Sequence, residues 1–320
     1  MKLYLKNILF FLCYAFIVSA CLIAGYFAYY GISLRDIPAP DLSESYSFNE
    51  KMEFLRKRNK NADIVTIGSS MSLNNLDSKT IIKHVGSDSY LNLSSWGMSM
   101  KDIFLLLKVQ SEIHHPRVLI LANSVLDFQM TDKNVKYPVL KLFLHSSDYR
   151  QVYYHLKFFN LKYYLTNFKF ASQVRSVGNN YEFLGYDQYG AVNLDGNNFQ
   201  IDEARWKRDY LTASRFLPKE YAYLDSISSF CERSKIKFFF LQSPYRTGLY
   251  SKFDETKMKV LKDHVAKVES SVSLHHQTFI NANNGVWGDS LFVDGTHFNR
   301  QGAKAFTHYC FGNLKGISLN

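Results

Sequence analysis

The chain has 320 residues, of which 47% are hydrophobic and 16% aromatic, a composition that supports a buried core and excludes an intrinsically disordered protein. Its length suits one large α/β domain, with or without a sizeable insertion. The net charge is +10. The basic residues form no dense block and no nucleic-acid-binding motif is present, so we expect no nucleic-acid partner. The positive charge is either a simple bias of composition or a basic surface that attracts an anionic glycan or the anionic face of a membrane.

The N-terminal segment has the pattern of a membrane anchor. Lys2 and Lys6 precede an almost unbroken apolar run over residues 8–30, and the next charged residue is Arg35. A run of this length spans a bilayer as a helix. The positive-inside rule keeps the end with the lysines in the cytoplasm and sends the rest of the chain across. We therefore predict an anchor over residues 1–35 and an extracytoplasmic remainder, in the periplasm or at the cell surface.

The cysteines leave two questions open. Val18-Ser19-Ala20-Cys21 resembles a bacterial lipobox, in which Cys21 is acylated after cleavage, although the apolar sequence continues past Cys21. An ordinary cleaved signal peptide is a third possibility for this segment. Further along, Cys231 and Cys310 could form one disulfide in an oxidising compartment or remain as buried thiols.

After the anchor, residues 36–60 read as a spacer and a leading helix, and residues 61–320 as one domain. Short apolar runs of β type alternate there with helical patterns, which indicates a parallel sheet covered on both faces. We therefore predict a three-layer α/β/α domain with a five-stranded parallel sheet. The expected strands are 63–68, 90–93, 118–122, 236–241 and 278–282. The expected helices are 78–85, 101–113, 220–234, 255–270 and 301–311.

The region over residues 127–215 interrupts this alternation. It is rich in Tyr, Phe, Lys and Asn, with aromatic doublets at 153–154, 158–159 and 163–164. We interpret it as a large insertion after the third strand. It could form a lid or one wall of a substrate groove, or its aromatic side chains could simply pack a subdomain.

Polar residues with complementary chemistry follow the predicted strands. Ser70 comes after the first strand, and Asp294 and His297 come soon after the fifth, so all should lie at the carboxyl edge of the sheet. His297 would take the proton of Ser70, and Asp294 would orient the imidazole. Ser69 and Ser72 are close enough to be the nucleophile instead. Ser70 could also be a helix N-cap, and Asp294 and His297 plain turn residues.

Four short segments give the chain a resemblance to the SGNH, or GDSL-like, hydrolase superfamily, in particular to its membrane-anchored extracytoplasmic branch. The first has Ser69 where the family usually has Asp, and the third lacks the family's Gly and Asp. The segments are Gly68-Ser69-Ser70, Leu91-Asn92-Leu93-Ser94-Ser95-Trp96-Gly97, Leu119-Ile120-Leu121-Ala122-Asn123-Ser124 and Asp294-Gly295-Thr296-His297.

The resemblance implies a flavodoxin-like SGNH fold and an oxyanion hole. Its donors would be the backbone N–H groups of Ser70 and Gly97 and the side-chain amide of Asn123. Ser124 is a competing donor for the last position. Gly97 could instead serve only to allow a positive φ in the turn after the second strand.

Other polar residues are less informative. Tyr245 and Arg246 follow the fourth strand, where they could contact substrate or shape the loop. The adjacent pairs His114-His115 and His275-His276 point in different directions on a helix or strand, so we expect neither to hold a metal. No metal and no cofactor are expected.

The resemblance also implies a function outside the cytoplasm. Anchored SGNH domains add or remove acetyl or related groups on cell-surface polysaccharides, commonly with a multi-pass membrane partner that passes the acyl group across the bilayer. We therefore expect acyl chemistry on an exported polysaccharide through a Ser70 acyl-enzyme, as O-acyltransferase or carbohydrate esterase according to the acceptor. The alternatives are a non-catalytic glycan-binding or assembly component, and a membrane-proximal lipase or thioesterase.

Overall fold

The computed structural model describes residues 2–29, 40–58, 61–145, 160–167, 185–194 and 203–312. The chain divides into two units, one with residues 2–29 and 160–167 and the other with the remaining described residues. In the first unit, α1 (Lys2–Tyr29) contains an exposed apolar stretch, Leu3–Gly25, with a mean hydropathy of 2.5. This helix is long and apolar enough to cross a membrane, as an anchor or as a signal sequence.

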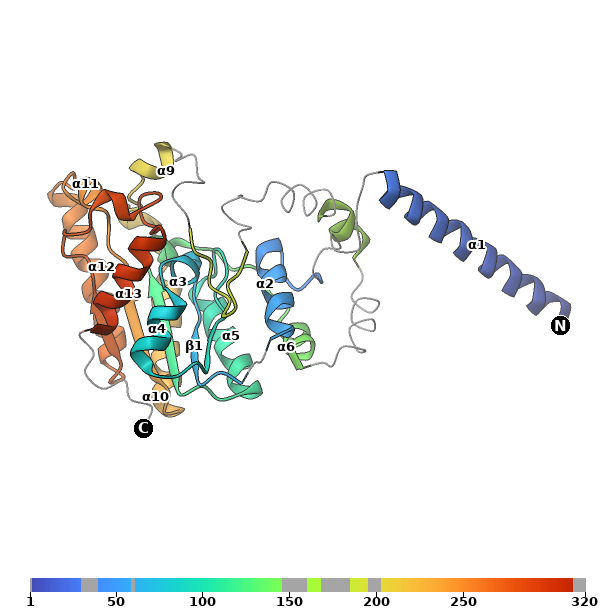
Figure 1. The fold of residues 1–320 in the computed structure, drawn as a ribbon, viewed down its shortest axis with the longest axis horizontal. Coiled ribbons are helices and arrows are strands. Elements are labelled where there is room, and N and C mark those ends of the chain that lie inside the picture. Colours follow the sequence, from blue (N-terminus) through green and yellow to red (C-terminus); the bar gives the residue numbers. More distant parts are fainter. Residues whose placement is uncertain are drawn as a thin grey trace. The chain divides into compact units, whose positions relative to one another are not determined.

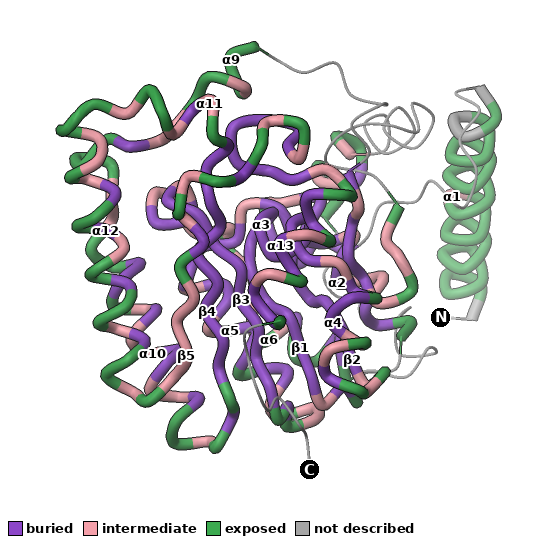
Figure 2. The backbone as a smooth tube through the Cα atoms, turned by 60° about the vertical axis from the view of Figure 1, so that its left-hand side comes forward, coloured by how far each residue is buried: buried purple, intermediate pink, exposed green. Residues whose placement is uncertain are grey.

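The second unit is built on one parallel sheet of five strands, as predicted. Figure 1 shows the sheet among its helices, and Figure 2 labels the five strands. Their order is β2-β1-β3-β4-β5, which is the flavodoxin-like order. Every strand pair is parallel. The strands are β1 (Ile64–Thr66), β2 (Tyr90–Asn92), β3 (Val118–Asn123), β4 (Lys237–Gln242) and β5 (Thr278–Asn281).

The strands β1 to β4 are buried almost throughout, as Figure 2 shows, and the edge strand β5 is only partly buried. Side chains along the strands alternate between two apolar clusters, one on each face of the sheet. On β3, Leu119 and Leu121 belong to one cluster and Ile120 and Ala122 to the other. One face is covered by α2 (Tyr46–Arg56), α5 (Met100–Ile113), α6 (Tyr137–His145), α10 (Pro218–Arg233) and α12 (Glu255–Ser273). The other face is covered by α4 (Ser78–Val85) and α13 (Arg300–Gly312). The predicted three-layer architecture is confirmed.

The ends of the helices follow from local chemistry. Asp77 caps the start of α4 by accepting a hydrogen bond from the backbone N–H of Thr80, and Gly86 ends the helix with a φ of 69°. Ser99 and Asp102 form a capping box at the start of α5. Several short helices were not predicted: α3 (Ser70–Asn74), η2 (Val125–Gln129), α9 (Glu203–Lys207), η4 (Ala213–Arg215), α11 (Thr247–Tyr250) and η5 (Asp289–Leu291).

The structure settles the pairing of the two cysteines in the globular part. Cys231 is buried in the cluster under α10, and Cys310 is buried in the cluster under α13. The two thiols are free and lie on opposite faces of the sheet, so no disulfide joins them. Burial raises the pKa of both thiols. Each therefore acts as a small apolar side chain.

The described parts of the insertion that belong to the second unit pack within it. Helix α6 adds Leu140 and Phe143 to the core, and the segment 185–194 returns to the carboxyl edge of the sheet. There the backbone N–H of Asn92 donates to the carbonyl of Tyr189. The doublets at 153–154 and 158–159 lie outside the described residues, so the lid interpretation stays a prediction.

A buried lysine fastens this returning segment to α2. The Lys51 side chain is fully buried and its ammonium donates to the carbonyl of Gly190. Nζ lies 4.5 Å from the centroid of the Tyr186 ring. Burial lowers the pKa of Lys51 from its ordinary 10.5 to about 7, and the nearby carboxylate of Asp187 partly opposes this.

This pKa predicts a pH-dependent stability. Between pH 7 and 10 the unfolded chain holds a proton on Lys51 that the folded chain has released, so the stability of the wild type should rise with pH, by at most about 1.4 kcal/mol per pH unit from this group. Urea unfolding of the full-length protein in detergent would measure it. Lys51→Met should remove this part of the rise, whereas Lys57→Met, at an exposed lysine just after α2, should keep it. Equal pH slopes for all three proteins would contradict the assignment.

Candidate active site

The candidate site lies at the carboxyl edge of the sheet, where the strand order changes direction between β1 and β3. In open parallel sheets, this switch point is where ligands bind. Ser70 is the first residue of α3, which follows β1. Asn123 ends β3, and Asp294 and His297 lie in the loop between β5 and α13.

The structure brings the three predicted catalytic residues into contact. His297 Nε2 lies 2.9 Å from Ser70 Oγ, although the two residues are 227 positions apart in the sequence. On the other side of the ring, His297 Nδ1 lies 2.8 Å from Asp294 Oδ2. The arrangement is that of a serine acyl-hydrolase triad, with the serine next to the base and the base oriented by a carboxylate.

The neighbouring serines have structural roles. Ser69 Oγ caps α3 by accepting a hydrogen bond from Met71 N at 3.2 Å. Ser72 Oγ donates to the carbonyl of Ala122 at 2.7 Å and accepts from its N–H at 2.8 Å. A Cβ on Gly68 would lie 2.2 Å from Ser72 Oγ, so only glycine fits there. Ser70 alone of the three serines contacts His297.

The turn that carries Asp294 holds its carboxylate ionised. Oδ1 accepts hydrogen bonds from the backbone N–H groups of Thr296 at 2.8 Å and His297 at 2.7 Å. Burial by itself would raise the pKa of Asp294, but His297 and these N–H groups outweigh it and hold the pKa well below its usual range. An ionised Asp294 can stabilise the imidazolium that forms when His297 accepts a proton.

Asn75 is a positioning residue that sequence analysis did not identify. It follows α3, and its side-chain amide donates to the carbonyl of Thr296 at 3.1 Å. Its Oδ1 accepts from the backbone N–H of Phe298 at 2.9 Å. The helix that carries Ser70 is thereby tied to the backbone on both sides of His297. Since these partners are more than 220 positions away, no local pattern marks Asn75.

Two of the proposed oxyanion donors are backbone groups. The N–H of Ser70 is in the first turn of α3, where no intrahelical acceptor exists. Gly97 has a φ of 62°, so it does allow the positive φ of the turn after β2. Its N–H donates to no acceptor within the described part of the chain. Allowing the turn and offering a donor are therefore compatible roles for Gly97.

The third donor position favours Asn123 over Ser124. Both polar atoms of the Asn123 side chain are buried and lack a partner among the described residues. In contrast, Ser124 is engaged by Asp127, whose Oδ2 accepts from Ser124 N at 2.7 Å and from its Oγ at 3.2 Å. A buried amide without a hydrogen-bond partner costs free energy until a ligand binds it. An oxyanion-hole donor is in this state before the oxyanion forms, so the unpaired Asn123 amide fits that role.

Asp127 itself is a buried acid that links the first and third segments of the site. Burial raises its pKa to about 6, against the hydrogen bonds from Ser69 and Ser124 and the nearby His297. The spacing Ser124-x-x-Asp127 is a capping-box pattern. This pattern could have identified the contact between the two residues from the sequence, but not the contact with Ser69.

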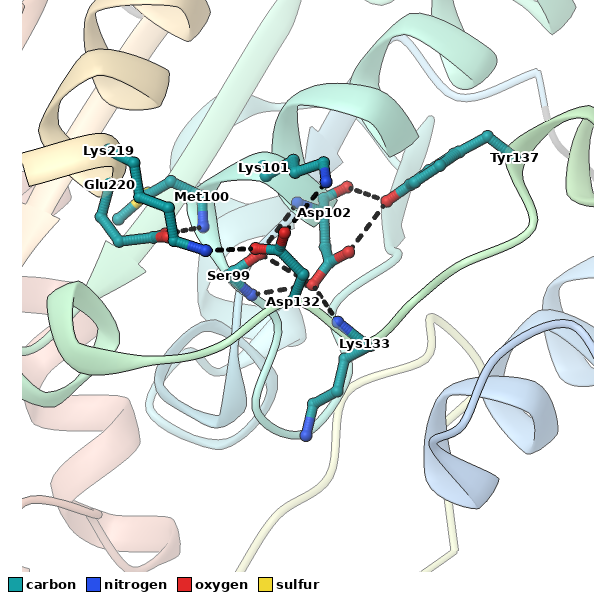
Figure 3. A network of polar contacts seen from close by, with 9 residues as sticks. All are labelled: Ser99, Met100, Lys101, Asp102, Asp132, Lys133, Tyr137, Lys219 and Glu220. Carbon is teal, nitrogen blue, oxygen red and sulfur yellow. Dashed lines mark hydrogen bonds and ion pairs between the residues drawn. The ribbon is translucent and has the colours of Figure 1, made fainter. Parts of the chain in front are cut away.

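A polar network holds the start of α5, two residues after Gly97 (Figure 3). Asp102 Oδ2 accepts from Ser99 Oγ at 2.8 Å and from the backbone N–H of Lys133 at 3.2 Å. Glu220, from α10, accepts from the backbone N–H of Met100 at 2.7 Å. The Lys133 side chain closes the other side of the turn, because a Cβ on Gly97 would lie 2.9 Å from Lys133 Nζ.

The structure favours loop shaping, and not substrate contact, for the two residues after β4. The Tyr245 hydroxyl donates to the carbonyl of Asp209 at 2.5 Å. Arg246 pairs with Asp289 at 2.6 Å and donates to the carbonyl of Trp206 at 2.8 Å. Both side chains are buried, so their polar groups fasten loops inside the protein.

Among the described residues, no group of three or more His, Cys, Asp or Glu side chains is arranged to hold a metal ion. Three of the four histidines in the adjacent pairs lie beside carboxylates, and one of them, His276, is 3.9 Å from Glu232. His114 contacts Asp63 at 3.1 Å, and His275 contacts Glu232 at 3.0 Å.

Comparison with known proteins gives structural likenesses only. No family model matches the chain, and no curated protein matches it. A protein of Bacteroides fragilis, provisionally assigned as an acylhydrolase, is 9% identical over 82% of this chain and 93% of its own, with a TM-score of 0.39. A GDSL-like lipase of Bacteroides thetaiotaomicron is 10% identical over 83% of this chain and 97% of its own, also with a TM-score of 0.39. The strand order and the contacts among Ser70, His297 and Asp294 agree with the fold and the catalytic residues that the resemblance to SGNH/GDSL-like hydrolases implied.

The Gly97 turn allows a matched test of the oxyanion hole. Gly97→Ala and Gly86→Ala each put a side chain on a residue with positive φ, at a cost of about 1–2 kcal/mol. We expect the strain and the close Lys133 side chain also to displace the turn and its N–H in Gly97→Ala, which should slow reaction of the serine with a fluorophosphonate probe by about tenfold or more. At Gly86 a Cβ meets nothing within 4 Å, so its labelling rate should match the wild type. Equal rates in the two variants would exclude Gly97 from the reaction.

Proposed function

We propose that this chain is a serine-dependent acyl enzyme that forms an ester on Ser70. The observation that carries the proposal is the continuous contact from Asp294 through His297 to Ser70, at 2.8 and 2.9 Å. A serine hydroxyl is a weak nucleophile at neutral pH, and a base at hydrogen-bond distance overcomes this weakness.

The first half of the reaction acylates the serine. Ser70 Oγ attacks the carbonyl carbon of an ester while its proton passes to His297 Nε2, and the carbonyl oxygen becomes an oxyanion. The N–H groups of Ser70 and Gly97 and the Asn123 amide would stabilise that charge. The imidazolium is held by Asp294 and returns its proton to the leaving alcohol, so the bond to the alcohol breaks and the acyl group stays on Ser70.

The second half depends on the acceptor. A hydroxyl group, of water or of a sugar, gives its proton to His297 and attacks the acyl carbon, and Ser70 regains its proton as it leaves. With water the enzyme is an esterase, and with a sugar hydroxyl it is an O-acyltransferase. The described residues provide the same groups for both outcomes.

We further propose that the acyl group is acetyl or a similar short group and that the carrier is an exported or cell-surface polysaccharide. The apolar helix α1, with Lys2 and Lys6 near its start, supports anchoring with the domain outside the cytoplasm. The net charge of +10 supports an anionic partner. A multi-pass membrane protein would supply the acyl group if the reaction is a transfer.

Covalent labelling tests the acyl-enzyme directly. The full-length protein in detergent should react with a fluorophosphonate probe, and peptide mapping should place the adduct on Ser70. Ser70→Ala should abolish labelling, while Ser69→Ala should retain it with a stability loss of about 1 kcal/mol for the missing cap. Circular dichroism would show that both variants fold. An adduct on another serine, or a folded wild type that never reacts, would exclude this nucleophile.

The acceptor can be identified by following a labelled acetyl group. We expect the wild type to hydrolyse p-nitrophenyl acetate and, when a polysaccharide is present, to move part of the acetyl group to sugar hydroxyls. Mass spectrometry of the polymer would separate transfer from hydrolysis. A preference for long-chain over acetyl esters would instead indicate a lipase or thioesterase. Binding without any turnover would indicate a glycan-binding component.

A further inference from the structure

A recess between α4 and α13 is lined by positive charge. It has a volume of about 330 Å³, and its charged lining residues are Asp77, Lys79, Lys83, Arg300 and Lys304, with His308 beside them. The basic side chains are exposed, so they are available to a ligand from solution. We call this recess the α4/α13 groove.

The spacing of these residues gathers their charges on facing sides of two helices. Lys79 and Lys83 are four residues apart on α4, and Arg300, Lys304 and His308 repeat at the same interval on α13. Residues at this interval are neighbours on a helix surface, and like charges there destabilise it by a few tenths of a kcal/mol per pair. No carboxylate among the described residues forms an ion pair with the three lysines or with Arg300.

The single acid of the groove is already engaged. Asp77 Oδ2 accepts hydrogen bonds from Thr80 N at 2.8 Å and Thr80 Oγ1 at 2.6 Å, as the cap of α4. At the side of the groove, His84 Nε2 lies 2.9 Å from His308 Nδ1. Burial, His308 and Lys83 all lower the pKa of His84. The groove is therefore a region of uncompensated positive charge, which an anion would stabilise.

The groove is connected to the catalytic loop at both of its walls. Arg300 is three residues after His297, and its backbone N–H donates to the carbonyl of Leu194 at 2.8 Å. Leu194 packs in one cluster with Trp96, whose ring centroid is 6.0 Å from that of His297. On the other wall, Asp77 comes two residues after Asn75, which binds Thr296.

We propose that the α4/α13 groove binds an anionic polysaccharide, through carboxylate or phosphate groups carried on successive sugars, beside the Ser70 site. This deepens the proposed function, on which it rests for the choice of a glycan. A membrane surface is the less favoured partner, because basic surfaces that bind membranes carry apolar side chains that insert, and none of the exposed large apolar residues in the described chain lines the groove.

The test compares two triple variants of equal charge. Lys79→Gln, Lys83→Gln and Lys304→Gln remove the groove lysines together. Lys252→Gln, Lys259→Gln and Lys262→Gln remove three exposed lysines in or just before α12, on the opposite face of the sheet. Binding of oligogalacturonate, with neutral dextran of similar length as comparison, is measured by calorimetry on the full-length protein in detergent.

We expect the wild type to bind oligogalacturonate and not dextran, and to lose affinity as salt rises. The groove variant should bind at least tenfold more weakly, and the α12 variant within twofold of the wild type. Equal losses in the two variants, or equal binding of dextran, would overturn the proposal. Unchanged oligogalacturonate binding by the groove variant, with lost binding to vesicles of anionic lipid, would assign the groove to the membrane.

Ser70→Ala separates this inference from the proposed reaction. It removes the nucleophile at a position outside the groove, so oligogalacturonate should bind as in the wild type. If the wild type bound oligogalacturonate but none of its serines could be labelled, the groove assignment would stand and the acyl-enzyme would be refuted. If Ser70 of the wild type were labelled but oligogalacturonate did not bind, the acyl-enzyme would stand and the groove assignment would be refuted.

Discussion

The site depends on how the Asp294 carboxylate is used inside its own turn. One oxygen accepts two backbone N–H groups of the turn, and the other faces the imidazole of His297. The same carboxylate thus sets the conformation of the loop and the orientation of the base. A short backbone bridge between Phe292 and Phe298 closes the loop behind it. The other ring nitrogen of His297, Nε2, is left for Ser70, which β1 and α3 place at a distance of 2.9 Å.

Strand and helix patterns allowed most of the fold to be predicted. The sheet is apolar on both faces and its helices are amphipathic, so the β-type runs and helical patterns marked nearly every long element to within a few residues. Short helices escaped prediction because they have too few residues for a periodic signal. Helix α3 is the most important example, since Ser70 is its first residue and Ser69, not Ser70, is its N-cap.

Contacts between distant segments account for what the sequence could not show about the site. Asn75, Asp127 and Lys51 act on groups from other parts of the chain, so their roles depend on the folded structure. Tyr245 and Arg246, in contrast, were considered as substrate-binding residues from the sequence, but their contacts favour a structural role. They follow a strand at the correct edge of the sheet, but their polar groups bind Asp209 and Asp289 inside the protein. The departure from the family pattern at Ser69, where the family usually has Asp, can also be explained by the structure. Ser69 caps the helix, as Asp would, and contacts the buried Asp127.

The sequence distance between nucleophile and base has a consequence for how this protein is made. Ser70 is among the first residues of the domain, and its base lies 227 positions later, near the end. No shorter nascent chain contains both partners, and contacts of such long range form late because loop closure must precede them. The reactivity that we propose for Ser70 therefore depends on a contact that cannot form before residue 297 has been made and that belongs to the late, long-range part of folding.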